Sequence, residues 1–318
     1  MPSTKCLDAV TTTKWMLTKS GVWPKTNMTS FDKFKLVINL VYALSLLIMM
    51  LIEIIRVWKN YDKLAEILGT IFPYGTYGCK LVALACKKQY FFNIMKDIDS
   101  AVFNSHAEEL KKPIAQTVLI SKTAEKIFKV MLLILLMIYL IFPIIDHNAL
   151  PIPVSYELGN YYYLMHWYQM TALILTAWNI SCIDLLFTSF VSIAAAQINI
   201  LREKLRTSHI ALDDMFNENV RKTLHDCIEL HTSIIRYLEN INSVFSEVVL
   251  VQYVSAMILI CNFVMQLLFL VDPLSTQFVW SFAFLLVILT ELLLYHWFGN
   301  DVVVMCRYTL LVLASTAS

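Results

Sequence analysis

Long runs of apolar residues, separated by charged stretches, dominate the pattern along the chain. Six of them approach or exceed the roughly 20 mostly apolar residues that a helix needs to cross a bilayer. They cover residues 36–55, 64–86, 127–145, 168–196, 248–271 and 278–298. Backbone amides in hydrocarbon must be bonded within their own segment, so each run predicts a transmembrane helix. We therefore predict an all-α, polytopic helical membrane protein.

The second run is the weakest of the six. Pro73 and three glycines interrupt it, and it carries Glu66 and Lys80. A helix of this kind is tolerated in a membrane when its neighbours cover the exposed backbone and the charges.

The basic residues between the runs predict the orientation. Twenty lysines and arginines fall before the first run, in the second and fourth loops, and after the sixth run, whereas three (Arg56, Lys59 and Lys63) fall on the other side. Basic loops are retained in the cytoplasm. The amino terminus is therefore predicted to be cytoplasmic. An apolar stretch typical of a cleaved signal peptide is not visible in the first thirty residues, so the first span is expected to direct insertion.

Composition agrees with a membrane protein and argues against other classes. Hydrophobic residues make up 58% of the 318 residues and charged residues 15%, whereas soluble domains are closer to half apolar and a quarter charged. The net charge of +1 gives no general attraction to nucleic acid. None of the seven cysteines falls in a predicted outer loop, so no extracellular disulfide is expected.

The spans and loops divide the chain into five parts. These are a cytoplasmic amino-terminal segment (1–35), the first four spans (36–196), a cytoplasmic helical region (197–247), spans five and six (248–300) and a carboxyl-terminal segment (301–318). In the third part, the fourth helix is expected to continue through Leu205. An amphipathic helix then leads into the fifth span. Its apolar positions are Leu224, Cys227, Ile228, His231, Ile234, Ile235, Leu238 and Ile241. They could pack within the protein or form an assembly surface between subunits.

No catalytic or cofactor motif is found. The chain lacks G-x-S-x-G, a phosphate-binding loop and a dinucleotide fingerprint, so an enzyme is not expected. His225 and His231 are six residues apart and lie on different helical faces, which does not favour a metal site. Lys80, Asp184 and Glu291 lie in the inner halves of predicted spans. They could pair with one another as structural groups or line a water-filled vestibule.

Aromatic residues gather toward the predicted outer side and suggest a ligand pocket. Met170, Ile174 and Trp178 recur every four residues and so share one face of the fourth span. The candidate ligand-binding residues are Tyr74, Tyr77, Tyr139, Phe142, Met170, Ile174 and Trp178. Such a set could line an apolar pocket for a small volatile molecule. Packing in the bundle core and placement at the membrane interface are the alternatives for the same residues.

Several short motifs resemble one family. Tyr295-His296-Trp297-Phe298-Gly299-Asn300-Asp301, at the end of the sixth run, resembles the motif that follows the sixth span of insect odorant receptors. Gly21-Val22-Trp23-Pro24 is similar to an amino-terminal signature of hymenopteran members, and Leu150-Pro151-Ile152-Pro153 to the start of their long outer loop. Residues 197–205 and 245–252 are similar to the exit of their fourth helix and the entry to their fifth.

The resemblance implies an odorant-gated, non-selective cation channel subunit that binds a small apolar odorant. It implies a heterotetramer with the family's common co-receptor, with ligand bound among spans two, three, four and six and the subunits anchored through the cytoplasmic extensions. It also implies a multi-pass protein of the cell membrane in sensory neuron dendrites. A gustatory-type chemoreceptor of the same superfamily is the neighbouring alternative.

One departure bears on conduction. The family has a seventh span that lines the pore, whereas residues 302–314 are too few to cross a bilayer. The sequence thus shows six spans of a seven-helix family fold, and a non-conducting truncated product is a further alternative. A G-protein-coupled receptor would need an outside amino terminus, and a small transporter would be expected to show internal repeats.

Overall fold

The computed structural model describes residues 5–317 apart from 107, 146–149, 151, 153, 155–158, 211–217 and 273–274. The described residues form helices and the turns between them, with no strand among them. The elements are η1 (Cys6–Ala9), α1 (Thr11–Ser20), α2 (Ser30–Val57), α3 (Tyr61–Cys86), α4 (Lys88–Ile98), α5 (Ala101–Asn104), η2 (Glu108–Lys111), α6 (Lys112–Ile145), η3 (Gly159–Tyr161), α7 (Tyr162–Ile210), α8 (Glu218–Met265), the π-helical turn η5 (Gln266–Leu270) and α9 (Thr276–Ala317). This confirms the predicted all-α class.

All six predicted spans lie in helices, namely α2, α3, α6, α7, α8 with η5, and α9. Within the described parts of the chain, four segments are long and apolar enough on their own to cross a membrane. They are Ser30–Val57, Gly159–Thr207, Arg221–Phe269 and Gln277–Tyr308. The second span, α3, is less apolar because of Pro73, its glycines and Lys80, yet it remains one continuous helix.

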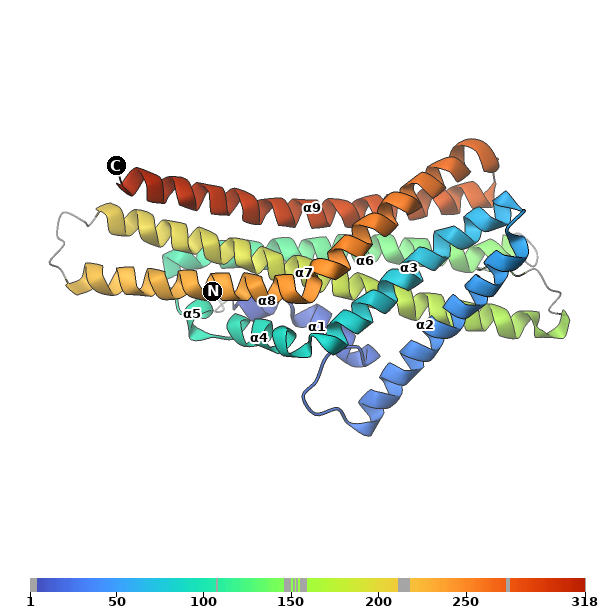
Figure 1. The fold of residues 1–318 in the computed structure, drawn as a ribbon, viewed down its shortest axis with the longest axis horizontal. Helices are drawn as coiled ribbons and strands as arrows, with labels where there is room; N and C mark the ends of the chain where they lie inside the picture. The colour runs from blue at the N-terminus through green and yellow to red at the C-terminus, as the bar shows by residue number, and fades with distance from the viewer. Residues whose placement is uncertain are drawn as a thin grey trace.

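Three of the helices are much longer than a bilayer requires. The 49 residues of α7 span about 74 Å at 1.5 Å per residue, against a hydrocarbon core of about 30 Å. The predicted continuation of the fourth span and the amphipathic helix before the fifth are both confirmed as parts of α7 and α8. Residues 301–317 continue α9 without a break. At one end of the molecule α7, α8 and α9 run on together beyond the other helices (Figure 1).

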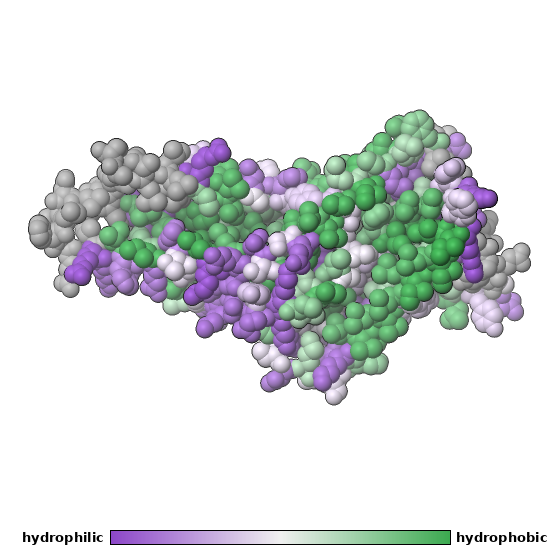
Figure 2. Space-filling model, viewed as in Figure 1, coloured by the Kyte–Doolittle hydropathy of each residue, from purple (hydrophilic) through white to green (hydrophobic). Residues whose placement is uncertain are grey.

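The surface separates into two zones along the long axis. Figure 2 shows hydrophobic residues gathered over α2, α3 and the adjoining part of α8, and hydrophilic residues over α4 and the other half of α8. On α2 the side chains of Val37, Val41, Leu44, Ile48 and Ile55 are all more than half exposed. An apolar surface of this extent is the surface of a protein that faces lipid.

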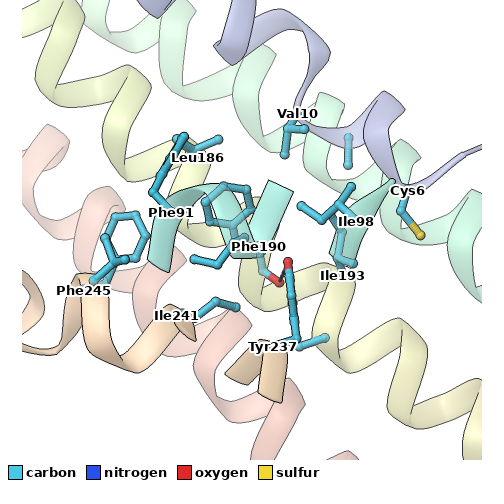
Figure 3. Packing of buried hydrophobic residues seen from close by; sticks show 14 of the residues in the cluster. Cys6, Val10, Phe91, Ile98, Leu186, Phe190, Ile193, Tyr237, Ile241 and Phe245 are labelled. Carbon is cyan, nitrogen blue, oxygen red and sulfur yellow. Dashed lines mark hydrogen bonds between the residues drawn. The ribbon is translucent and has the colours of Figure 1, made fainter. Parts of the chain in front are cut away.

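The largest buried cluster lies at the predicted cytoplasmic side, where the amino-terminal helices pack on the bundle. It joins side chains from η1, α1, α4, α7 and α8 (Figure 3). Phe91 of α4 is fully buried and contacts Trp23 edge-to-face, with ring centroids 5.0 Å apart. The Tyr237 hydroxyl donates to the backbone oxygen of Phe190 across 3.1 Å. Fully burying each such side chain contributes roughly 1.5–3 kcal/mol, so this cluster fixes α4 and the amino terminus on α7 and α8.

A buried polar network ties η1 to α5 and α7. The Gln197 amide donates to the Cys6 sulfur (3.3 Å) and to the Phe103 carbonyl (3.0 Å), and its oxygen lies 3.1 Å from His106 Nε2. Burial raises the pKa of the Cys6 thiol to about 12. Burial also lowers the pKa of the His106 imidazole. Both groups are therefore held neutral in the fold.

The sharp turn between α1 and α2 depends on Gly21. Its φ of +83° is unfavourable for residues with a Cβ, and an added Cβ would lie 2.5 Å from the Cβ of Lys35. The following amides of Val22 and Trp23 both donate to Leu17, which closes the end of α1. The Gly21–Pro24 motif is thus explained by a left-handed turn that directs Trp23 into the core.

Candidate functional site

A mostly apolar cavity of about 100 Å³ lies between α3, α6, α7, α8 and α9. Its apolar wall consists of Pro73, Phe128, Leu132, Leu135, Leu173, Ala177, Ile180, Ala256, Leu259, Phe284, Val287 and Ile288. Polar lining residues are Thr70, Tyr74, Thr76, Tyr139, Thr176, Ser181, Asp184, Gln252, Ser255 and Glu291. On α7 the lining runs from Leu173 to Asp184, about 16 Å along the helix axis. The cavity is therefore long and narrow and has two chemically different ends.

The inner end is made of buried charged groups. Lys80 Nζ lies 2.6 Å from Asp184 Oδ1 and 3.7 Å from Glu291 Oε1, and the Lys80 side chain is fully buried. The Tyr295 hydroxyl donates to Asp184 Oδ1 (2.6 Å), and Gln252 Nε2 donates to Glu291 Oε1 (2.8 Å). Of the two alternatives left open for these charges, the structural ion pair is confirmed. We call Lys80, Asp184, Gln252, Glu291 and Tyr295 the inner polar cluster.

The outer end is aromatic. Tyr74 and Tyr139, from α3 and α6, are 2% and 5% exposed and line the cavity. Tyr139 packs edge-to-face on Trp280 with 5.0 Å between the ring centroids, and Phe263 lies against the same tryptophan. Behind this wall Gly69 allows α3 to approach α8 closely. A Cβ at this position would lie 3.0 Å from the Phe263 ring. The aromatic groups therefore close the cavity on this side.

Ile152, in the connection between α6 and α7, packs on the bundle near Tyr74. Both backbone groups of Ile152 pair with the Gln169 side chain of α7: the Ile152 amide donates to Oε1 (3.0 Å) and Gln169 Nε2 donates to the Ile152 carbonyl (3.2 Å). The Ile152 side chain is fully buried in a cluster with Tyr74 and Ala172. The resemblance motif at Leu150–Pro153 thus contains the residue that fastens this loop to the bundle.

The predicted ligand-binding residues are distributed over several environments. Tyr74 and Tyr139 line the cavity. Tyr77 is buried outside the cavity. There Asn179 Nδ2 donates to the Tyr77 hydroxyl (3.1 Å) and to Asn39 Oδ1 (2.7 Å). Three others do not line the cavity: Met170 is buried in a cluster with Trp280, Ile174 is 41% exposed, and Trp178 packs at the edge of the large buried cluster. The side chain of Phe142 lies outside the described part of the chain. Ligand binding by these seven residues stays a prediction.

The lining face of α7 was missed by the sequence analysis. The cavity contacts Leu173, Thr176, Ala177 and Ile180, which lie on a different face from Ile174 and Trp178. Small and hydroxyl-bearing residues on this face leave the space that the larger residues would fill. Their spacing, with Asp184 as its continuation, was the available signal, since a span has little reason to carry a charge on its lipid side.

The family-motif residues also separate in space. Tyr295 and Phe298 are buried, whereas Trp297 is 68% exposed. Tyr295 connects the motif to the cavity through Asp184 and stacks on Phe187 with 5.0 Å between the ring centroids. His296 lies 5.3 Å from the Tyr253 ring. Asn300 and Gly299 follow on the same helix. Within the described residues, the motif therefore couples α9 to α7 and α8.

These features define a polytopic helical membrane protein with an internal apolar cavity that is closed at one end by buried charges. A family model described as 7tm Odorant receptor matches residues 63–307, and the chain belongs to this family. The match begins within α3 and continues into the final third of α9, so it includes every helix that lines the cavity.

Solved structures have the same fold. The insect olfactory receptor OR5 from Machilis hrabei superposes with a TM-score of 0.83 at 12% sequence identity, covering 94% of this chain and 81% of that one. The same receptor in complex with eugenol gives a TM-score of 0.83 at 11% identity, with the same coverage. No curated protein sequence matches the chain.

Proposed function

We propose that the chain is an odorant receptor subunit that binds a small volatile molecule in the cavity between α3, α6, α7, α8 and α9. The observation that carries the proposal is the cavity itself, enclosed among the helices matched by the family model and mostly apolar. Apolar cavities with a few polar groups are the usual form of small-molecule sites. The OR5 structure solved with eugenol supports the same kind of ligand.

The size of the cavity fits a small ligand. A dry protein cavity of about 150 Å³ accommodates benzene, so about 100 Å³ suits a ligand no larger than benzene unless the walls move. Tyr74 and Tyr139 are the predicted ligand-binding residues that we retain as contacts. Transfer of about 300 Å² of apolar surface is worth at most about 7 kcal/mol, which after ordering costs gives binding in the micromolar class.

Binding is proposed to open a non-selective cation channel formed with the family's common co-receptor in a heterotetramer. The cytoplasmic-side extensions of α7, α8 and α9 are the proposed anchor between subunits. The whole of α7, about 74 Å long, exceeds what a span requires, and the extension of α8 presents exposed apolar residues such as Leu224 and Ile228. We assign a role to each part of the chain. Residues 36–196, together with spans five and six in residues 248–300, form the proposed ligand pocket, and residues 197–247 form the proposed assembly region. Residues 1–35 and 301–318 flank these parts. A ligand opens the channel if it binds the open state more tightly than the closed state. The proposed location is the cell membrane of sensory neuron dendrites.

The test is odorant-evoked current after co-expression with a co-receptor. Replacing Ala177 with phenylalanine puts a ring into the cavity and is expected to abolish the response while surface expression persists. The control is Ile174→Phe, which adds a ring on the same helix at a position that is 41% exposed and outside the cavity. Loss of current in both variants, or in neither, would count against the cavity as the odorant site.

A further inference from the structure

The inner polar cluster presents unpaired acceptors to the cavity. Gln252 Nε2 donates to Glu291 Oε1 and the Tyr295 hydroxyl donates to Asp184 Oδ1, while Lys80 Nζ forms ion pairs with the same two oxygen atoms. Within this cluster Asp184 Oδ2, Gln252 Oε1 and Lys80 Nζ have no hydrogen-bond partner among the described residues, and of these three residues Asp184 and Gln252 line the cavity. Asp184 and Gln252 are 3% and 7% exposed, and both line the cavity. Two buried acceptors thus lie at its inner end with nothing to bind.

Buried acceptors without partners are costly, and a ligand can remove this cost. Burying a polar atom without a hydrogen bond costs roughly 1–3 kcal/mol in proteins. A ligand with an O–H group at one end can satisfy such an acceptor, whereas a carbonyl oxygen is itself an acceptor and would add another one.

The opposite end of the cavity does not impose this requirement. Tyr74 and Tyr139 carry hydroxyls, which can donate as well as accept. A ketone can therefore be accommodated near the tyrosines, but only a donor suits the inner polar cluster. The apolar wall between the two ends leaves the rest of the ligand without further polar contacts.

We infer that the cavity selects small amphiphilic molecules with a hydrogen-bond donor, namely short-chain alcohols, through Asp184 and Gln252. This inference rests on the proposed odorant-binding function and adds the chemical class of the ligand. The alcohol oxygen lies against the inner polar cluster and its alkyl chain points toward Tyr74 and Tyr139. A ketone of the same shape binds at least about tenfold more weakly, the usual value for losing a hydrogen bond to a charged group.

The experiment compares 2-pentanol with 2-pentanone, which have the same carbon skeleton and differ in the donor. Apparent affinities come from current dose–response curves in cells that express the full chain with a co-receptor, and from ligand-induced shifts in the melting temperature of the purified chain. The wild type is expected to prefer 2-pentanol by at least about tenfold in both measurements.

Three variants assign the preference to named atoms. Gln252→Met keeps the side-chain length and removes an acceptor, so the preference for 2-pentanol is expected to fall severalfold. Asp184→Asn replaces the carboxylate by an amide, which can itself donate, so the preference is expected to fall further. Tyr139→Phe removes a hydroxyl from the outer end and is expected to leave the preference unchanged or raise it. The melting-temperature measurement on each purified variant also shows whether it is folded.

The possible outcomes separate the two proposals. Equal affinities for 2-pentanol and 2-pentanone in the wild type, together with odorant-evoked current, overturn the donor inference and leave the odorant-receptor function standing. A preference that persists unchanged in folded Gln252→Met and Asp184→Asn also overturns it. Absence of current and of any melting shift with either compound and with a broad odorant panel overturns the proposed function itself.

Discussion

Replacing Lys80 with methionine removes the positive charge that lies between Asp184 and Glu291, and it keeps an unbranched side chain of similar length. Lys80 is fully buried, 2.6 Å from one carboxylate and 3.7 Å from the other, so water cannot take its place at low cost. Removing one partner of a buried ion pair typically costs about 3–5 kcal/mol, because the charge left behind is uncompensated. With about 2–4 °C per kcal/mol, the melting temperature should fall on the order of 10 °C.

The assay is thermal unfolding of the detergent-purified chain, with size-exclusion chromatography to show that the sample is monodisperse. Lys63→Met is the matched control, since this lysine belongs to the same helix and is exposed. Its effect should stay within about 0.5 kcal/mol. The triple variant Lys80→Met, Asp184→Asn, Glu291→Gln replaces all three charges by neutral groups and should recover most of the loss. A Lys80→Met protein that melts at the wild-type temperature would refute the ion pair as a stabilising contact of the bundle.

Three further predictions concern the predicted cytoplasmic side and its connections. Gly21→Ala, at φ +83° and with its Cβ 2.5 Å from a neighbouring side-chain atom, should destabilise the protein by at least about 1 kcal/mol in thermal unfolding, whereas Gly75→Ala, which has open space around it, should be neutral or stabilising. Burial lowers the pKa of His106, so the unfolded state binds a proton at this histidine before the folded state does as the pH falls. The free energy of unfolding should therefore be at its full value above the ordinary histidine pKa of about 6.5 and should decline below it. His106→Gln should remove this part of the pH dependence of the melting temperature. Because burial raises the pKa of the Cys6 thiol to about 12, maleimide at pH 8 should label the exposed Cys86 in the native protein and leave Cys6 unmodified, and rapid labelling of Cys6 would show that η1 is not packed on the bundle.

The cavity brings the aromatic residues and the charged residues of the spans together in one site. Tyr74 and Tyr139 line its aromatic end, and Asp184 and Glu291 line its charged end, where both form ion pairs with Lys80. Along the sequence the two sets of residues are separate features. They meet because α3, α7 and α9 place their charged residues at the same depth, where the family motif at Tyr295 also joins them.

The orientation of α7 about its own axis explains why some residues predicted to bind ligand do not line the cavity. Met170, Ile174 and Trp178 share one face of α7, and so do Leu173, Ala177 and Ile180, but only the second set lines the cavity. All of these are apolar residues of a kind found both against lipid and inside a bundle. The pattern along one helix therefore determines which residues share a face, but the neighbouring helices decide which face is inside.

The sequence by itself determined the helical class, the six apolar helices, the long continuation of α7 and the helix that leads into α8. These properties follow from local rules, because a backbone in hydrocarbon must bond within its own helix and an amphipathic repeat is visible along the chain. Tertiary structure alone decided which helix faces surround the cavity, which carboxylate the lysine approaches, and which acceptors remain without partners. Those outcomes depend on contacts between residues as far apart as Lys80 and Glu291, whose distance in space is set only when all the helices have packed together.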